Sequence, residues 1–489
     1  MTGAAFTSSL AVDLGASGGK SFLGSFDPDR SVVFVKQVRV FQNHAVAMGG
    51  HLYWDIPRLW EEIKESMKLA GPVSSIGIDS WGVDFALLRE GEMLGLPYAY
   101  RDPCFKGAMD QVLRLLPKEE IFQKTGIQFL EFNTLYQLFW LSRHASHKLR
   151  SSLLMIPDLF HYYLTGIPAG ELTNATTTQL MGLDGRWWEE AMRLLGIELE
   201  LPTTLKPSAN VGELGGDVSA EVGFRASVIL PATHDTASAI AAAPEVSDDV
   251  AYVSSGTWDL VGLELSSPIA TREAMLNNFS NEGGAFKKFN FLRNVQGMWI
   301  IQGLKRSFER ADGREYSYEE MVKLATSSPD VECYVDVDDP VFALPRDMSE
   351  AVIRYLEETG QPKPMGKGEM ARAVMRSLAM KRRYVVELAG KLSRKKVKGV
   401  NVVGGGSKNS LLNQMTADVL SLPVFAGPDE ATAVGNLLVQ QVGLGSLSRS
   451  DLREVVMRSF RVEVYEPKRA DDGYPDFLRL IEGRKGRQA

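Results

Sequence analysis

Cysteine is scarce in this sequence, which contains Cys104 and Cys333 far apart and no CxxC pair. A zinc site built from several cysteines and a disulfide framework are therefore excluded, and both thiols should stay reduced. Long apolar runs are also missing, because no segment approaches the roughly 18 residues that span a bilayer. No positively charged region precedes the apolar stretch near the start. We expect a cytoplasmic protein that does not enter a membrane.

An excess of positive charge is absent as well, because 54 Lys and Arg stand against 61 Asp and Glu, for a net charge of -7. A general nucleic-acid surface needs clustered positive charge to displace counterions. The composition therefore argues against nucleic acid and favours a small-molecule partner. It does not indicate an oligomeric state.

The length of 489 residues is about twice the size at which one hydrophobic core stops growing, so two domains are expected. We place their boundary near residue 243, in AAAPEVSDD, because proline and acidic residues often mark such joints. The predicted domains are 1–243 and 244–465, followed by a C-terminal segment at 466–489. A cleft between the domains is the natural place for a site.

Each predicted domain contains a glycine-rich hairpin. Residues 10–26 form the pattern of strand, turn and strand, with GASGG as the turn. Residues 250–263 repeat this pattern around the turn at 254–257. The segments between them alternate strand-like and helix-like patterns, which indicates a layered α/β protein. One amphipathic helix is predicted after Asp55, a candidate N-cap, with Leu59, Ile63 and Met67 on one face.

The first turn is a candidate phosphate site. Its small residues let backbone N–H groups approach phosphate oxygens, and Asp13 could hold a hydrated Mg²⁺. The alternative is an ordinary glycine-rich turn. A P-loop would need glycine at position 14, where this chain has Leu14, and no GxGxxG follows the strand. The P-loop and Rossmann interpretations are therefore both disfavoured.

Three other segments combine residues that can carry chemistry. Asp235 precedes an alanine-rich helical stretch, where a carboxylate can take a proton from a hydroxyl or can simply cap the helix. Gly404–Gly406 lie between a buried-looking strand and a helix whose candidate N-cap is Ser407 or Asn409. Their backbone could face a purine ring and phosphate, or they could simply form a tight turn. Ile78–Asp84 place two carboxylates beside an indole, which suits a polyol or a locally bonded strand end.

Taken together, AVDLGAS, HDTASA, SSGTW and VVGGGSKN resemble the FGGY family of carbohydrate kinases, from about Val12 to about Gly445. The resemblance implies a two-domain, actin-like and ribonuclease-H-like α/β fold, with ATP held mainly by the C-terminal domain and sugar mainly by the N-terminal one. Four further runs, IGIDSWGVDF, TGIQFLEFNTLYQL, TNATTTQL and NEGGAFKKFNFLRNVQGMWIIQ, resemble the branch that acts on L-rhamnulose. L-fuculose, L-xylulose and a non-catalytic sugar sensor remain the alternatives.

The resemblance also implies roles for individual residues. Asp235 is the implied catalytic base, and Mg²⁺ is held through water by Asp13. The implied sugar-binding residues are Gly82, His234, Asp235, Thr236 and Asn294. The implied ATP- and phosphate-binding residues are Ala16, Ser17, Gly18, Gly19, Lys20, Thr257, Gln302 and Gly405.

Three positions depart from the family pattern: Gly18 replaces a common serine, and Lys20 and Cys104 replace common arginines. Lysine keeps the positive charge at position 20 but loses the fork that grips phosphate through two hydrogen bonds. The change at Cys104 bears on which sugar is bound more than on the type of reaction.

Overall fold

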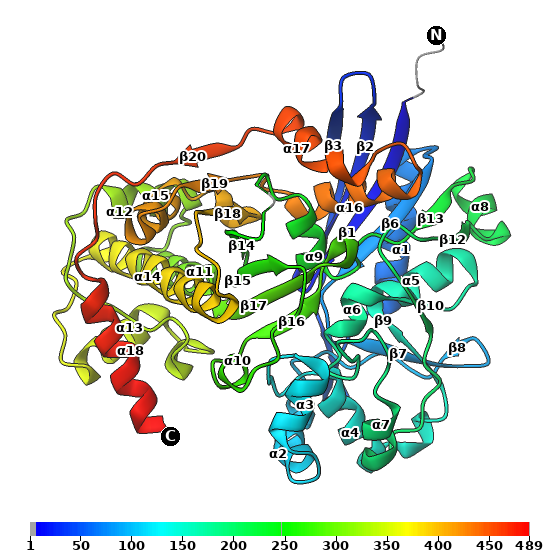
Figure 1. Ribbon diagram of the computed structural model, residues 1–489, viewed down its shortest axis with the longest axis horizontal. Helices are drawn as coiled ribbons and strands as arrows, with labels where there is room; N and C mark the ends of the chain where they lie inside the picture. The colour runs from blue at the N-terminus through cyan, green and yellow to red at the C-terminus, as the bar shows by residue number, and fades with distance from the viewer. Residues whose placement is uncertain (1–5, 246, 489) are drawn as a thin grey trace. The chain divides into compact units, whose positions relative to one another are not determined.

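A computed structural model describes residues 6–245 and 247–488 of the chain. These residues form two compact units (Figure 1). Unit 1 comprises the described residues up to 242 together with 264–291 and 431–460, and unit 2 comprises the remainder. Neither unit is one continuous stretch, because a late segment of the chain belongs to the first unit. In the described ranges, no helix is long and apolar enough to cross a membrane.

The main sheet of unit 1 contains the first predicted hairpin, and its strand order is β12-β13-β6-β1-β2-β3. Its strands are β1 (Thr7–Gly15), β2 (Gly18–Asp27), β3 (Val32–Gln42), β6 (Ser75–Ser80), β12 (Asn210–Glu213) and β13 (Ser227–Ile229). β1 and β2 pair antiparallel, as a hairpin requires, and β6 joins β1 in parallel. Because parallel strands end at the same edge of a sheet, polar residues near the ends of β1 and β6 lie close together.

Helices cover both faces of this sheet. α1 (Ile56–Ala70) and α5 (Ile156–Thr165) share an apolar core with Leu10 and Val12 of β1. Ala11 points to the opposite face, as strand alternation requires, and packs with Leu437 of α16 (Ala431–Gly443). The orange ribbon of α16 lies beside the blue strands β1 and β2 in Figure 1. A strand covered on both faces explains why β1 is apolar at nearly every position.

α1 has the predicted start and the predicted buried face. The Asp55 carboxylate accepts a backbone N–H of the first turn at 3.2 Å. Leu59, Ile63 and Met67 are buried. A side-chain cap of this kind stabilises a helix by about 1 kcal/mol.

The remaining elements of unit 1 form smaller sheets and connecting helices. The strands of the smaller sheets are β4 (Val46–Met48), β5 (His51–Tyr53), β7 (Phe85–Arg89), β8 (Glu92–Met93), β9 (Ser152–Met155), β10 (Ala169–Glu171) and β11 (Thr203–Leu205). β16 (Ser280–Gly283) is instead the edge strand of the second large sheet. Its other helices are α2 (Ala108–Leu113), α3 (Lys118–Thr125), α4 (Thr134–His144), α6 (Leu172–Thr176), α7 (Glu189–Leu195), α8 (Gly216–Val222), α9 (Asp235–Ala241), α10 (Arg272–Leu276) and α17 (Leu452–Ser459).

The second large sheet has the same arrangement around the second hairpin, in the order β16-β17-β15-β14-β18-β19-β20. Besides β16, its strands are β14 (Val250–Ser255), β15 (Trp258–Leu265), β17 (Phe289–Gln296), β18 (Gly399–Val403), β19 (Val424–Ala426) and β20 (Glu463–Tyr465). β14 pairs antiparallel with β15 and parallel with β18, just as β1 pairs with β2 and β6. The two predicted hairpins therefore occupy equivalent positions in their sheets.

Long helices pack together in unit 2. They are α11 (Met298–Asp312), α12 (Tyr318–Thr326), α13 (Met348–Glu358), α14 (Lys367–Ser393), α15 (Ser410–Leu420) and α18 (Tyr474–Gln488). α14 contacts α11, α12, α15 and α18. α15 begins after Asn409, one of the two predicted caps, whose side chain accepts the Leu412 backbone N–H at 3.0 Å.

Candidate active site

The turn between β1 and β2 carries the predicted phosphate-binding residues of unit 1. Ala16 and Ser17 connect the strands, and Gly18–Lys20 begin β2. Gly19 has no room for a side chain, because a Cβ there would lie 2.1 Å from the ring of Phe41. The Phe41 ring therefore packs directly against the backbone of Gly19, which is buried.

Two carboxylates lie side by side next to this turn. Asp13 on β1 and Asp79 on β6 are partners in the parallel register. Asp79 is fully buried, and its Oδ2 accepts a hydrogen bond of 2.5 Å from Nδ2 of Asn436 on α16. Burial, followed by the charge of Asp13, raises the pKa of Asp79 well above its usual value, and Asp235 adds to the effect. Oxygen ligands of this kind suit a hard divalent cation such as Mg²⁺.

Asp235 is the first residue of α9, and the preceding His234 is the N-cap residue. The Asp235 side chain is 31% exposed. Its Oδ1 accepts the Thr236 backbone N–H at 2.6 Å, while Oδ2 is the second acceptor of the carboxylate. Asp235 therefore stands one residue inside the N-cap position, and its carboxylate satisfies a backbone N–H of the first turn. His234 Nδ1 lies 3.4 Å from Oε2 of the buried Glu282.

A buried network that sequence reasoning missed holds the segment before Asp235. Glu171 is fully buried, and its Oε2 accepts the Thr233 backbone N–H at 2.9 Å and the Thr233 hydroxyl at 2.8 Å. The same carboxylate accepts both the N–H and the hydroxyl of Thr173, and Thr173 Oγ1 accepts the His234 N–H at 3.1 Å. Glu171 thus fixes the backbone that leads into α9.

Gly82 lies in a tightly held turn after β6. A Cβ on Gly82 would stand 2.9 Å from the side chain of Thr177, so only glycine fits without movement. The next residue, Val83, has φ of 69°, which is strained for a β-branched side chain. Its N–H donates to Thr177 Oγ1 at 3.0 Å, and its carbonyl accepts from Thr134 Oγ1 at 2.6 Å. Such strain costs roughly 1–3 kcal/mol and persists where surrounding contacts enforce it.

Asp84 closes this turn and is used for internal support. Its carboxylate accepts hydrogen bonds from both indoles, Trp54 at 2.6 Å and Trp81 at 3.0 Å. The side chain of Gln137 and the backbone of Tyr100 donate to it as well, at 3.0 and 3.1 Å. Burial raises the pKa of Asp84 to about 6, although these hydrogen bonds oppose the rise. Of the two interpretations of this strand end, local bonding describes Asp84.

In unit 2, the second hairpin turn meets the start of α11. The Gly256 carbonyl accepts the Met298 N–H at 3.0 Å, and the Thr257 carbonyl accepts the Trp299 N–H at 3.1 Å. Thr257 is thereby held at the N-terminus of the helix that carries Gln302 one turn later. The first N–H groups of α11 are therefore used to hold the turn, while the positive end of the helix dipole still lies beside Thr257.

A buried ion pair supports this second turn, and it was not predicted. Arg382 of α14 and Asp259 of β15 are both fully buried, and Arg382 Nε lies 2.7 Å from Asp259 Oδ2. Arg382 Nη2 also donates to Ser255 Oγ at 2.9 Å, and Ser255 donates to Asp259 at 2.8 Å. The carboxylate next to this turn is therefore neutralised by a guanidinium group.

The triple-glycine loop lies against the same turn. Gly404 has φ of 81°, and a Cβ on Gly406 would stand 2.0 Å from Ser255 Oγ. Gly405 is exposed, with open space where a side chain would be. The structure thus brings the predicted residues Thr257 and Gly405 to one end of the unit 2 sheet.

Asn294 lies on β17 near a charged group of unit 2. The neighbouring Arg293 approaches Asp338 at 3.6 Å, and Lys381 binds Asp338 at 2.9 Å and Asp336 at 2.6 Å. Burial acts to raise the pKa of Asp338, but Lys381 and then Arg293 outweigh it and lower that pKa. Asn294 is half-buried, and its Oδ1 is a buried acceptor without a hydrogen-bond partner among the described residues.

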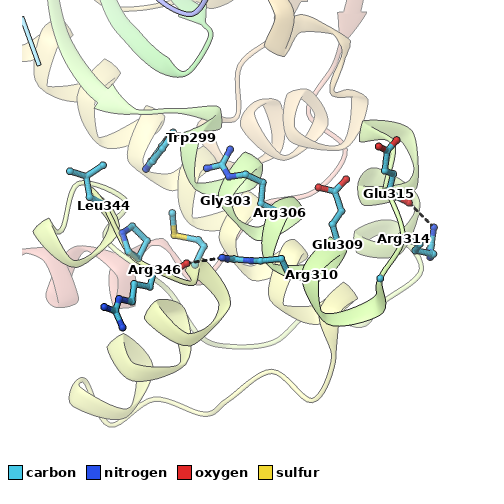
Figure 2. Close-up of a pocket in the computed structure, with 12 residues that line it drawn as sticks. Trp299, Gly303, Arg306, Glu309, Arg310, Arg314, Glu315, Leu344 and Arg346 are labelled. Atoms are coloured by element: carbon cyan, nitrogen blue, oxygen red, sulfur yellow. Dashed lines mark hydrogen bonds between the residues drawn. The ribbon is translucent and has the colours of Figure 1, made fainter. Parts of the chain in front are cut away.

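A basic groove runs along α11, with a volume of about 710 Å³ (Figure 2). Arg306 lies over the Trp299 ring at 4.9 Å, and Arg310 donates to the Arg346 carbonyl at 3.0 Å. Figure 2 shows these side chains along one side of the helix. None of the predicted site residues lines the groove, although Gln302 is on the same helix.

The predicted site residues thus divide between the units. Unit 1 gathers its set around the ends of β1 and β6 and the start of α9: Asp13, Ala16–Lys20, Gly82, His234, Asp235 and Thr236. Unit 2 places its set on β17, on α11 and at the ends of β14 and β18: Thr257, Asn294, Gln302 and Gly405.

The sequence matches two domains of a known family along most of its length. Residues 8–241 match the N-terminal domain of the FGGY family of carbohydrate kinases, and residues 251–444 match its C-terminal domain. The chain therefore belongs to the FGGY family of carbohydrate kinases, and the predicted family is confirmed. As in any such kinase, ATP is the expected phosphate donor.

Individual relatives show which members of the family this chain is similar to. The chain is 42% identical to a rhamnulokinase of Halalkalibacterium halodurans, over 94% of this chain and 98% of the relative. A rhamnulokinase of Bacteroides thetaiotaomicron is 38% identical over 94% and 96%, and one of Bacillus subtilis is 35% identical over the same shares.

Solved structures share the fold at lower sequence identity. A ligand-bound xylulose kinase of Lactobacillus acidophilus has a TM-score of 0.76 and 18% identity, covering 99% of both chains. A glycerol kinase of Plasmodium falciparum with ADP has a TM-score of 0.78 and 14% identity, covering 99% of this chain and 98% of that one. The predicted α/β fold of sugar kinases is confirmed.

Proposed function

We propose that the chain transfers the γ-phosphate of ATP to the 1-hydroxyl of L-rhamnulose, giving L-rhamnulose 1-phosphate and ADP. The observation that carries the proposal is full-length similarity, at 35–42% identity, to relatives named rhamnulokinase. The family membership supports the reaction type independently of the sugar.

Asp235 is the proposed general base. One of its oxygens is held by the Thr236 N–H, which orients the carboxylate, and the side chain remains partly exposed. The sugar oxygen attacks the γ-phosphorus, its proton passes to Asp235, and the bond from that phosphorus to the β-γ bridging oxygen breaks to release ADP. The transition state is loose, so positioning and electrostatics carry most of the catalysis.

The phosphate and metal roles follow from charge. The turn Ala16–Lys20 and the residues Thr257, Gln302 and Gly405 are the proposed ATP-binding groups. Asp13, beside Asp79, fits a hydrated Mg²⁺ because both offer carboxylate oxygens. When bound, Mg²⁺ neutralises charge on the β- and γ-phosphate oxygens.

Sugar binding is proposed for Gly82, His234, Thr236 and Asn294. His234 and Thr236 flank Asp235, and Ser80 forms a β-bridge to His234, which links the end of β6 to the base. The Glu171 network fixes the same backbone. Together these contacts support a rigid platform for the hydroxyl that reacts.

The substrate is tested by initial-rate ADP release with Mg-ATP and a panel of L-rhamnulose, L-fuculose, L-xylulose and no sugar. A clear preference for L-rhamnulose is expected. Preference for another ketose would keep the kinase and change its substrate. An ATP-binding protein that is silent with every sugar would favour a sugar sensor.

The base is tested by Asp235→Asn. We expect sugar binding to persist and kcat to fall about 10²- to 10⁴-fold. Asp217→Asn is a matched control, because Asp217 is an exposed aspartate in the first turn of α8. Near-normal turnover in Asp235→Asn would overturn the assignment.

A further inference from the structure

Three potential metal ligands lie close together in unit 1. One of them is far from the other two in the sequence, so no sequence motif would show the group. They are His51 on β5, Asp102, and Cys104 in the short helical turn Pro103–Phe105. One ligand atom from each lies within 4.8 Å of the other two. His51 Nδ1 is 3.2 Å from Asp102 Oδ2 and 3.4 Å from Oδ1. None of the three is among the residues proposed for ATP, sugar or Mg²⁺.

The carboxylate at the centre of this group is rigidly held. The Asp102 side chain is fully buried, its Oδ1 accepts the Cys104 backbone N–H at 2.8 Å, and its Oδ2 accepts the Leu52 N–H at 2.5 Å. A carboxylate offers about four lone pairs, so two remain after these backbone bonds. His51 lies within reach of them.

We propose that His51 Nδ1, an Asp102 oxygen and Cys104 Sγ bind one Zn²⁺ ion. Nitrogen, oxygen and sulfur are the donors that Zn²⁺ takes, commonly three from the protein with water in the fourth position. Ligand distances of about 2.0–2.3 Å in a tetrahedron place ligand atoms roughly 3.3–3.8 Å apart. The observed spacing between His51 and Asp102 is close to this range, and Cys104 Sγ lies within 4.8 Å of both.

Proton and charge balance also suit the ion. Binding releases the thiol proton of Cys104 and requires the His51 proton to sit on Nε2. The two positive charges of Zn²⁺ are then matched by the carboxylate of Asp102 and the thiolate of Cys104. The His51 side chain is 31% exposed, which leaves an approach for the ion and for a water ligand.

The surroundings form an ordered outer layer. The His51 ring meets Tyr98 edge-on at 5.3 Å and Trp140 at 6.0 Å, and Phe105 meets Trp140 at 5.6 Å. Rings on this side limit solvent, which strengthens the attraction between the ion and its ligands. The backbone donors to Asp102 supply the outer hydrogen bonds that orient a metal ligand.

The experiment uses the full chain, treated with a chelator, incubated with Zn²⁺ and dialysed before its metal content is measured. We expect about one Zn²⁺ per chain. Cys104→Ser and His51→Gln should each weaken Zn²⁺ binding by roughly tenfold or more. Cys333→Ser is the matched control, because Cys333 is buried in unit 2 and should leave binding unchanged.

Cobalt supplies a second readout that reports the ligands directly. Co²⁺ bound to the native chain should show a thiolate-to-cobalt charge-transfer band, which Cys104→Ser removes and Cys333→Ser retains. Loss of Zn²⁺ during dialysis of the native chain, absence of that band, or unchanged Zn²⁺ affinity in Cys104→Ser would each overturn the proposal. In those cases Asp102 serves only to cap the turn and bind His51.

Discussion

Unit 1 and unit 2 hold their buried carboxylates in opposite ways. In unit 1, Asp84 and Glu171 accept hydrogen bonds from indole, amide, hydroxyl and backbone groups, and burial raises the pKa of both. In unit 2, Asp259 is paired with the guanidinium group of Arg382. Neutral donors leave a carboxylate able to gain a proton near neutral pH, whereas a cation keeps it charged.

This difference separates the two glycine-rich turns, which otherwise occupy equivalent positions. Next to the first turn, Asp13 and Asp79 face each other, and their repulsion favours a proton or a cation. Next to the second turn, Asp259 is already paired with Arg382, so it adds no uncompensated negative charge there. The comparison supports the proposed cation site at Asp13, beside the first turn, and leaves the proposed phosphate contacts of Ala16–Lys20 and Thr257 unchanged.

The largest expected effect comes from breaking the buried ion pair between Arg382 and Asp259 in unit 2. Arg382→Met leaves Asp259 buried without its partner and should lower the free energy of unfolding by about 3–5 kcal/mol. Adding Asp259→Leu should restore much of the loss, because no buried charge remains. Denaturant titration, with hydrogen exchange in α14 to locate the effect, measures both.

The control for this prediction is an exposed ion pair of the same unit. Lys363 pairs with Glu357, and both side chains are 52% exposed. Lys363→Met should change stability by no more than about 1 kcal/mol. Equal losses in Lys363→Met and Arg382→Met would contradict the distinction between buried and exposed pairs.

The next effect is a pH dependence of unit 1. Folded Asp84 keeps its proton up to a pKa of about 6, whereas an unfolded aspartate loses it near 3.8. Its contribution to stability is therefore complete below pH 3.8 and is lost as the pH rises to 6, by roughly 3 kcal/mol. Asp84→Asn should abolish this part of the pH dependence. The unfolding free energies of the variant and the native chain should be compared from about pH 3.5 to 7, which covers both pKa values. A difference that stays constant over this range would contradict the assigned role of Asp84.

A smaller effect is expected from Glu171→Gln. Glutamine has one acceptor oxygen in place of two, so donors from Thr173 or Thr233 lose their partner, at about 1–3 kcal/mol. Because this backbone leads into Asp235, kcat should fall while the affinity for ATP stays unchanged. Glu213→Gln is the control, since Glu213 is exposed and also accepts from a serine hydroxyl. Matching kinetics for both variants would argue against a positioning role.

The smallest effect is expected from Asp79→Asn. Burial and Asp13 favour the neutral form of Asp79, and an asparagine oxygen can still accept from Asn436. The free energy of unfolding at pH 7 should change by less than about 1 kcal/mol. Relief of the repulsion between Asp79 and Asp13 would make this change an increase. A large loss, comparable with that of Arg382→Met, would show that the two units hold carboxylates in the same way.

Local patterns account for what could be predicted. The two hairpins, the α1 face of Leu59, Ile63 and Met67 and the Asn409 cap all depend on residues close in sequence. The network of Glu171 could not be found this way. Its partner Thr233 is 62 residues away in the sequence. The run of threonine and asparagine after Glu171 is polar, so the sequence gives no indication that this segment is buried.

The sequence by itself determined the family, the hairpins and the residue types offered to each site, because motifs and periodicity are local properties. Only the tertiary structure decided that α16 belongs to unit 1, where Asn436 meets Asp79, and that Arg382 neutralises Asp259. It also decided that His51 meets Cys104. Such pairings depend on which distant segments share a core, and that choice is set by the burial of whole faces rather than by any single residue.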